Sequence, residues 1–159
     1  MEKILKLLSE NARLTNEQLS VMTEISKGEV DRIIEKYEAD GTIRGYKAFI
    51  DFEKTDTNLV SALIELKVAP KRNYGFEQIA ETIMNFEEVE SVYLMSGGFD
   101  LAVMVTGKTF KEVALFVSHR LAPLESVMST ATHFVLRKYK DKGFSFCDKE
   151  RDDRGNISL

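Results

Sequence analysis

The sequence predicts an α+β protein in two parts, an N-terminal winged helix-turn-helix and a C-terminal ferredoxin-like βαββαβ sandwich domain. Three observations lead to this prediction. Apolar residues recur at helical spacing through the first fifty residues. From residue 60 onward, segments that alternate apolar and polar residues are interrupted by two helical segments. Between the two patterns, residues 51–58 are polar and rich in turn-forming residues, which makes them the best linker candidate.

The first part, residues 1–50, opens with helical periodicity and continues with two helix-start signals. Ile4, Leu7 and Leu8 lie on one face of a helix. Thr15–Gln18 and Ser26–Glu29 each have the pattern of a capping box, in which two side chains satisfy exposed backbone amides at a helix start. Two short capped helices joined by three residues indicate a helix-turn-helix, and a small three-helix bundle of another kind is the alternative.

The end of this part predicts the wing. Gly41 is placed to stop the second capped helix, because glycine accepts the left-handed conformation common after helix ends. Residues 43–49 then alternate apolar and polar side chains, which is typical of a strand. A strand pair after the second helix would form the wing.

The second part, residues 59–140, predicts four strands and two helices in the order β-α-β-β-α-β. Gly97 and Gly98 are a hairpin signal between the second and third strands. Thr109–Glu112 has the capping-box pattern at the start of the second helix. The predicted strands cover residues 60–68, 89–95, 101–105 and about 127–139, and the predicted helices cover residues 76–84 and 110–121.

The predicted sheet has apolar residues on both faces. Val92 and Leu94 alternate with Tyr93 and Met95, so neither side of this strand is polar. Two helices on one face leave the other face open, and an open apolar face predicts a partner sheet from a second copy. The alternative cover is the tail, residues 141–159, but its mixed charges favour a solvated, partly disordered segment.

Composition limits the class of protein. The chain has 159 residues, 22 Lys and Arg, 26 Asp and Glu, and a net charge of -4, so a general coat of positive charge is excluded. Cys147 is the single cysteine, which is typical of a reducing compartment. No stretch approaches the ~18 apolar residues of a membrane span, so a cytoplasmic protein without a membrane partner is expected.

The sequence offers little for catalysis. Thr106–Thr109 lacks the earlier glycine of a phosphate-binding loop, since Ala102 stands there. His119 and His133 have no neighbours at triad or metal-ligand spacing, so no catalytic residue, metal or cofactor is expected. The turn Gly97-Gly98-Phe99-Asp100 is either a plain hairpin turn or a place where a ligand approaches the backbone and Asp100 holds an ammonium group.

Basic residues on the second capped helix and after it could contact DNA. These are Lys27, Arg32, Lys36, Arg44 and Lys47. From residue 26 to 40, however, three basic residues face five acidic ones, so this segment is net -2. Few phosphate contacts and weak non-specific affinity are therefore expected, and an acidic helix of an interaction module is the alternative.

The whole arrangement resembles the leucine-responsive/asparagine regulator (Lrp/AsnC) family of bacterial and archaeal transcription factors over roughly residues 2–139. The order and spacing of several segments carry the resemblance. They are Ile4–Leu8, Asn11–Arg13, Glu17–Leu19, Ile25–Ser26, Gly41–Tyr46, Ser96–Leu101 and Val127–Leu136.

The resemblance implies a transcription regulator that binds double-stranded DNA and a small effector, commonly an amino acid. It implies a homodimer that assembles further to a tetramer or octamer. The DNA-contacting residues expected are Ser26, Lys27, Glu29, Arg32, Lys36, Arg44 and Lys47, and the effector-binding residues expected are Gly97, Gly98, Phe99 and Asp100.

Two departures and two alternatives accompany the resemblance. Ile33 stands where the family commonly has an arginine on the recognition helix, and Ser126 stands where a glycine is usual. One alternative function is a tetrapyrrole (sirohaem) decarboxylase, because some such enzymes resemble this family. The other is a ligand-sensing module without DNA binding, which the acidic helix would suit.

Overall fold

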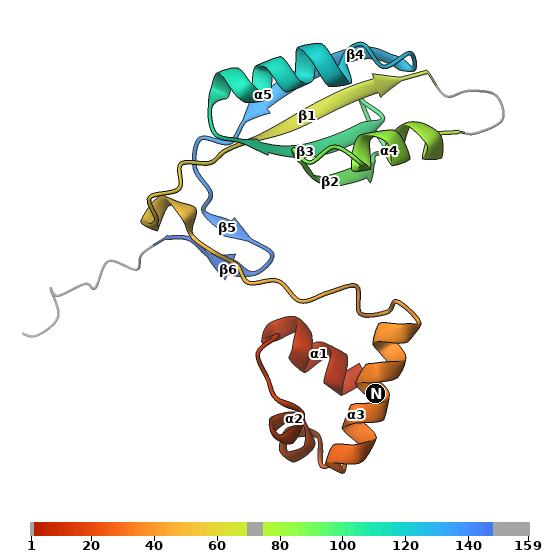
Figure 1. The fold of residues 1–159 in the computed structure, drawn as a ribbon, viewed down its shortest axis with the longest axis vertical. Coiled ribbons are helices and arrows are strands. Elements are labelled where there is room, and N and C mark those ends of the chain that lie inside the picture. Colours follow the sequence, from red (N-terminus) through yellow and green to blue (C-terminus); the bar gives the residue numbers. More distant parts are fainter. Residues whose placement is uncertain (1, 70–74, 148–159) are drawn as a thin grey trace, which may run out of the picture. The chain divides into compact units, whose positions relative to one another are not determined.

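The computed structural model describes residues 2–69 and 75–147 (Figure 1). Contacts within the chain divide it into two compact units, Met1–Ile50 and Asp51–Leu159. We call them the head and the body. No helix in the described ranges is both long and apolar enough to cross a membrane.

The head consists of three helices around a small apolar core. They are α1 (Glu2–Glu10), α2 (Asn16–Thr23) and α3 (Lys27–Ala39). The predicted capping box at the start of α2 is confirmed: the Gln18 amide donates to Thr15 Oγ1, and the Thr15 amide donates to Gln18 Oε1. The buried residues that form the core of the head are Ile4, Leu19, Val30, Ile33 and Ile34.

The ends of α2 and α3 follow from local backbone chemistry. Glu24 after α2 and Gly41 after α3 both have left-handed backbone angles, which reverse the chain at a helix end. Ser26 Oγ then accepts the Glu29 amide and starts α3. The two predicted helices and their short turn are therefore confirmed.

The strand predicted over residues 43–49 is not formed, so that prediction is wrong. Residues 44–50 belong to neither a helix nor a strand. A single segment gains no ladder hydrogen bonds without a partner, and the described part of the head contains no strand that could pair with it. Alternation of apolar and polar residues indicates a segment that can form a β-strand, but it does not show whether a second strand is present to pair with it.

The body confirms the β-α-β-β-α-β order. A short 3-10 turn, η1 (Phe52–Lys54), precedes a four-stranded antiparallel sheet with the order β2-β3-β1-β4. The elements that follow η1 are β1 (Val60–Val68), α4 (Glu77–Met84), β2 (Val89–Leu94), β3 (Leu101–Gly107), α5 (Phe110–Phe116), the π-helical turn η2 (Val117–Leu121) and β4 (Val127–Phe134).

The core of the body lies between the sheet and its helices. Figure 1 shows α4 and α5 on the same side of the sheet. Central strand β1 buries alternate residues against these helices, and its partner β3 buries Leu101, Val103 and Val105. Burial of this apolar area is the main stabilising contribution to the unit.

The opposite face of the sheet is open and partly apolar. The strand register places Leu63 of β1 beside Met104 of β3, and Tyr93 of β2 beside Ala102. Tyr93 is 46% exposed. A polar contact lies on the same face, where His133 Nε2 is 3.3 Å from Glu65 Oε1. No cover over this face is present in the described residues of the chain.

The segment after β4 differs from its prediction. The last strand ends at Phe134 rather than near residue 139, and residues 140–145 form a hairpin instead of belonging to a disordered tail. This hairpin pairs β5 (Lys140–Asp141) with β6 (Phe144–Ser145). Its two turn residues both have positive φ, as a tight two-residue hairpin requires. Residues 148–159 of the predicted tail lie outside the described residues.

Candidate nucleic-acid interface and effector site

Helix α3 separates its residues into a core face and an exposed face. Val30, Ile33 and Ile34 are buried in the core of the head. Ile33 is only 8% exposed, so its side chain belongs to the core and not to the outer face of the helix. The predicted contact residues on the exposed face are Lys27, Glu29, Arg32 and Lys36.

The exposed side chains of α3 differ in their partners. Lys27 Nζ lies 2.6 Å from Glu17 Oε1 of α2. Arg32 Nη1 lies 4.0 Å from Glu29 Oε2, a looser pair, and the Arg32 side chain is 82% exposed. Arg32 is therefore the more available of these two cations for a ligand in solution.

The ion pair with Lys27 perturbs the acid that forms it. The hydrogen bond from Lys27 lowers the pKa of Glu17 to about 2, with smaller contributions from the backbone and from Thr15. The same contact raises the pKa of Lys27. Glu17 was not among the predicted site residues, and its contact crosses the turn between α2 and α3. A possible signal was its position in the first turn of α2, ten residues before Lys27.

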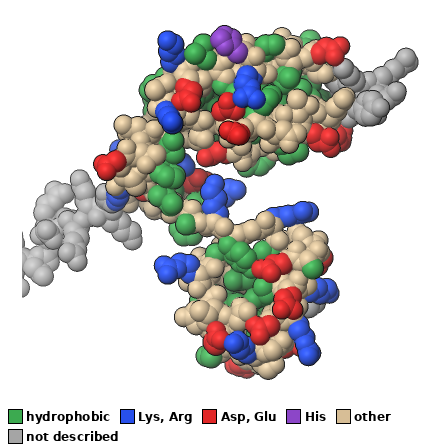
Figure 2. Space-filling model, in the orientation of Figure 1, with side chains coloured by type: hydrophobic (Ala, Val, Ile, Leu, Met, Phe, Trp, Pro, Cys, Tyr) green, Lys and Arg blue, Asp and Glu red, His purple; other side chains and the backbone are tan. Residues whose placement is uncertain are grey.

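The predicted contact residues after α3 lie outside helices and strands. The Arg44 guanidinium covers Gly41, since a Cβ added at Gly41 would come within 3.1 Å of Arg44 Cζ. Tyr46 donates a hydrogen bond to Glu38 Oε1 at 2.9 Å, and burial together with this carboxylate raises the pKa of the tyrosine. Lys47 is exposed. On the face of the head drawn in Figure 2, basic and acidic side chains are interspersed rather than separated by sign.

In the body, the turn that joins β2 to β3 contains the predicted effector residues. Gly97 and Gly98 are exposed, and a Cβ added at either would meet no atom within 4 Å. Phe99 and Asp100 are half-buried. The turn thus presents bare backbone to the solvent.

Asp100 forms hydrogen bonds to the end of β1, a structural role that the sequence did not indicate. Its Oδ2 accepts a hydrogen bond from the Val68 amide at 2.8 Å, and its own amide donates to the Leu66 carbonyl at 2.9 Å. These bonds fasten the turn to the end of β1. One carboxylate oxygen is consequently occupied inside the body, which reduces what Asp100 can offer a ligand.

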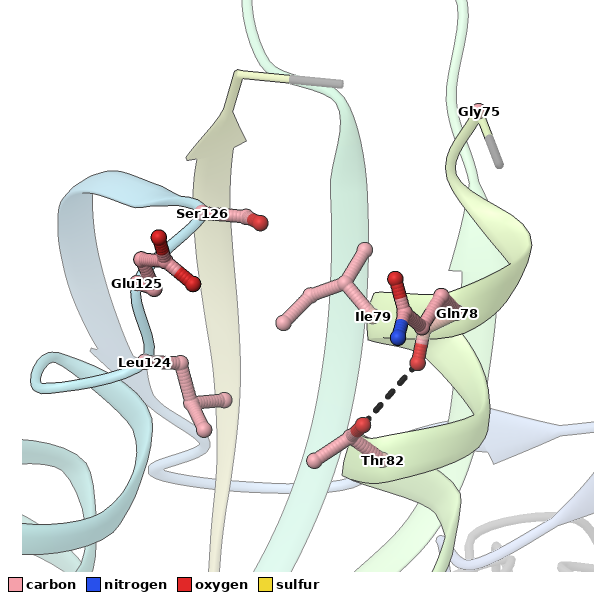
Figure 3. A pocket seen from close by; sticks show the side chains of 7 residues that line it. All are labelled: Gly75, Gln78, Ile79, Thr82, Leu124, Glu125 and Ser126. Atoms are coloured by element: carbon pink, nitrogen blue, oxygen red, sulfur yellow. Dashed lines mark hydrogen bonds between the residues drawn. The ribbon is translucent and has the colours of Figure 1, made fainter. Parts of the chain in front are cut away.

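A small hollow borders the same end of β1. Its volume is about 140 Å³, and it lies between α4 and the loop before β4 (Figure 3). The Ala69 amide, just after β1, donates to the Ser126 carbonyl at 2.9 Å, so the end of β1 contacts this loop as well as Asp100. The residues that line the hollow are Gly75, Gln78, Ile79, Thr82, Leu124, Glu125 and Ser126, none of which was a predicted site residue.

The two histidines do not form a site together. His119 is exposed on η2, which packs in the helical layer of the body. His133 lies on the open face of the sheet, beside Glu65. Within residues 2–69 and 75–147, no group of three or more His, Cys, Asp or Glu residues is placed to hold a metal ion.

A helix-turn-helix head followed by a body of this topology defines a class of protein, the DNA-binding transcription regulators with a ligand-binding domain. Two family models match the chain accordingly. Residues 2–44 match the winged helix-turn-helix DNA-binding model, and residues 61–143 match the Lrp/AsnC ligand binding domain. The chain belongs to the Lrp/AsnC family of transcription regulators.

Relatives over the full length agree with this assignment. An uncharacterized HTH-type transcriptional regulator of Bacillus subtilis, YugG, is 47% identical over 98% of this chain and 95% of its own length. The leucine-responsive regulatory protein of Haemophilus influenzae is 27% identical over 89% of this chain and 85% of its own. These relatives are named as transcriptional regulators, and the chain is accordingly a DNA-binding transcription regulator.

Solved structures show the same fold. A transcriptional regulator of Neisseria meningitidis in complex with L-Met has a TM-score of 0.71 and 27% identity, and the match covers 87% of this chain and 89% of that one. The AsnC protein of E. coli has a TM-score of 0.65 at 18% identity, covering 85% and 89%. The second likeness concerns the fold alone.

Proposed function

We propose that this regulator recognises specific DNA sequences through the exposed face of α3 and changes its DNA affinity when the body binds a small effector, an amino acid. The observation that carries the DNA part is α3 itself, a capped helix whose apolar face is buried and whose opposite face exposes Arg32 and Lys36. An exposed helix of this kind fits the major groove. The contact set remains Ser26, Lys27, Glu29, Arg32, Lys36, Arg44 and Lys47.

Charge determines how the head would bind. The head has eight basic and nine acidic residues, so it is itself net -1. Non-specific affinity comes mainly from phosphate contacts and is expected to be low. Base contacts by Arg32, together with two or more heads bound at once, would supply the affinity that phosphates do not.

The DNA surface is tested with duplexes selected from a random library. We expect Arg32→Ala to weaken binding to the selected duplex roughly tenfold and to relax its sequence preference, as loss of a base contact does. Lys36→Ala should weaken all duplexes and reduce the salt slope by about 1. Lys111→Ala on α5 of the body is the matched control. If neither head variant differs from this control, the contacts lie elsewhere.

For the effector we propose the turn Gly97–Asp100 together with the neighbouring hollow. The L-Met complex of the Neisseria regulator supports an amino acid as the chemical class. Gly97 and Gly98 leave backbone open to a ligand, and Ile79 and Leu124 in the hollow lining suit a small apolar side chain.

Two matched glycine variants test this site. A Cβ added at Gly98 or at Gly28 meets no atom within 4 Å, so neither change to alanine disturbs packing. Calorimetry with the twenty amino acids should find at least one that binds the wild type. We expect Gly98→Ala to weaken that binding about tenfold or more and Gly28→Ala to leave it unchanged. Equal binding by both variants would exclude the turn.

We also propose that the open sheet face pairs with the same face of a second copy. Leu63, Tyr93 and Met104 provide apolar area there that water would otherwise contact. Sedimentation equilibrium should find a dimer that associates further to a tetramer or octamer. Met104→Glu should shift the equilibrium towards monomer, whereas Lys111→Glu, on the helical side, should not. A wild-type monomer at all concentrations would contradict the proposal.

A further inference from the structure

The contact between Glu17 and Lys27 lies where α2 and α3 begin. Glu17 is in the first turn of α2, and Lys27 is the first residue of α3. Their charged atoms are 2.6 Å apart, although both side chains are more than half exposed. A lysine at the start of an exposed recognition helix is free to reach a DNA phosphate only when no nearer anion holds it.

The surroundings of this lysine are acidic. Asp31 lies one helical turn after Lys27 on α3 and adds to the attraction on its ammonium group. Asp31 is itself held by Asn16, whose Nδ2 donates to Asp31 Oδ1 at 2.6 Å. Neighbouring residues of α2, Asn16 and Glu17, thus each hold one residue of α3. Because Glu17 has a pKa of about 2, it stays charged at every pH at which the protein would meet DNA.

We propose that Glu17 is a specificity-determining residue that occupies Lys27 in place of a DNA phosphate when the protein is on non-specific DNA. A phosphate and a carboxylate are competing acceptors for one ammonium group. On non-specific DNA, the phosphates do not meet α3 in a fixed register, so the Lys27 ammonium group stays paired with the Glu17 carboxylate. At a selected site, α3 is seated in the groove, and Lys27 exchanges Glu17 for a fixed acceptor. The inference rests on the proposed DNA surface.

The consequence is a difference between two kinds of DNA. Each lysine that neutralises a phosphate contributes about 0.9 to the slope of log affinity against log salt. Release of Lys27 in Glu17→Gln should therefore steepen the slope on non-specific duplex by about 0.9 for each bound head. Non-specific affinity should rise roughly fourfold per head near 0.2 M salt. The slope on the selected duplex should change little, so the specificity ratio falls.

The experiment measures fluorescence anisotropy of a selected and a random duplex across a salt series, with the full chain. The matched control is Glu35→Gln, which removes the same charge from an exposed position of α3. Both variants gain affinity from the lost negative charge, but only Glu17→Gln should change the slope by about 0.9 on random duplex. Equal slopes for the two variants, or equal steepening of Glu17→Gln on both duplexes, would overturn the proposal.

A second pair of variants isolates the lysine. In a Lys27→Met background, adding Glu17→Gln should produce no further change in slope, and a change of the same size would overturn the proposal. If Glu17→Gln does not fold, Glu17→Asp replaces it in the experiment. Aspartate keeps the charge, but its shorter side chain reaches Lys27 less well, so the salt slope on random duplex should also steepen. If Arg32→Ala also has no effect, the DNA surface itself is wrong; if it weakens binding while Glu17→Gln has no effect, only this inference fails.

Discussion

The head and the body place their functional residues in opposite ways. Among the described residues of the head, five buried side chains form the core, and the candidate DNA contacts lie within one helix and the chain just after it. Among those of the body, thirteen buried side chains come from elements spread between residues 62 and 121, and the candidate effector turn is hydrogen-bonded to a strand residue 32 positions earlier. Substitutions on the exposed surface of one helix should therefore have little effect on the free energy of unfolding of the head. A site formed where distant strands meet depends instead on the folding of the whole unit.

The largest effects should come from replacing one buried core side chain with alanine, first in the head and then in the body. Leu19 is fully buried in the head, and Leu19→Ala should cost about 3 kcal/mol. A unit of this size has a free energy of unfolding of only about 3–7 kcal/mol, so the head would lose most of its stability and DNA binding would fail at temperatures that the wild type withstands. Effector binding by the body should persist.

Ile64→Ala is the reciprocal variant, because Ile64 is fully buried in the central strand of the body. It should lower the body's unfolding transition and effector binding while the head's transition stays in place. Denaturant titrations followed by amide NMR would separate the two units. If each variant lowers both transitions equally, the two units do not unfold independently.

The next effect concerns the bond between the turn and β1. Asp100→Ala would leave the amide of Val68, a residue only 4% exposed, without its acceptor, at a cost of about 2 kcal/mol. Asp100→Asn keeps an acceptor oxygen and should cost much less. Thermal unfolding of the body measures both. If Asp100→Ala is as stable as the wild type but loses its effector, Asp100 serves the ligand rather than the fold.

The same contrast explains what the sequence could and could not predict. Helix starts at Thr15, Ser26 and Thr109 were predicted because a cap and its partner lie three residues apart. The strand over residues 43–49 was wrong because pairing needs a second segment that local periodicity does not report. The bond from Val68 to Asp100 was missed for the same reason, since nothing near either residue indicates the other.

Smaller effects should come from the helix caps, one in each unit. Thr15 Oγ1 accepts the Gln18 amide in the head, and Thr109 Oγ1 accepts the Glu112 amide in the body. Replacement of either threonine by alanine should cost about 1 kcal/mol. Each should shift only its own unit's transition, and the shift should be more visible in the smaller head. Replacing Thr15 with serine, which keeps the hydroxyl, is the control.

The smallest effect is a pH dependence of the head. The pKa of Glu17 is about 2 in the folded head against an ordinary value of 4.5, so its pairing with Lys27 stabilises the head above about pH 4.5. That contribution is lost as the pH falls from 4.5 through 2. The unfolding midpoint of the wild-type head should therefore decline more over this range than that of Glu17→Gln. Parallel declines would show that the pair adds nothing to stability.

The proposed function requires that an amino acid bound by the body changes DNA binding by the head. The most direct measurement is the affinity for a selected duplex, across a salt series, with and without the amino acid that calorimetry identifies. We predict sequence-specific, salt-dependent binding whose affinity shifts at least fivefold with the effector, a typical coupling between sites. The contradictory result is binding that is absent at low salt, or that is unchanged by every amino acid bound by the body.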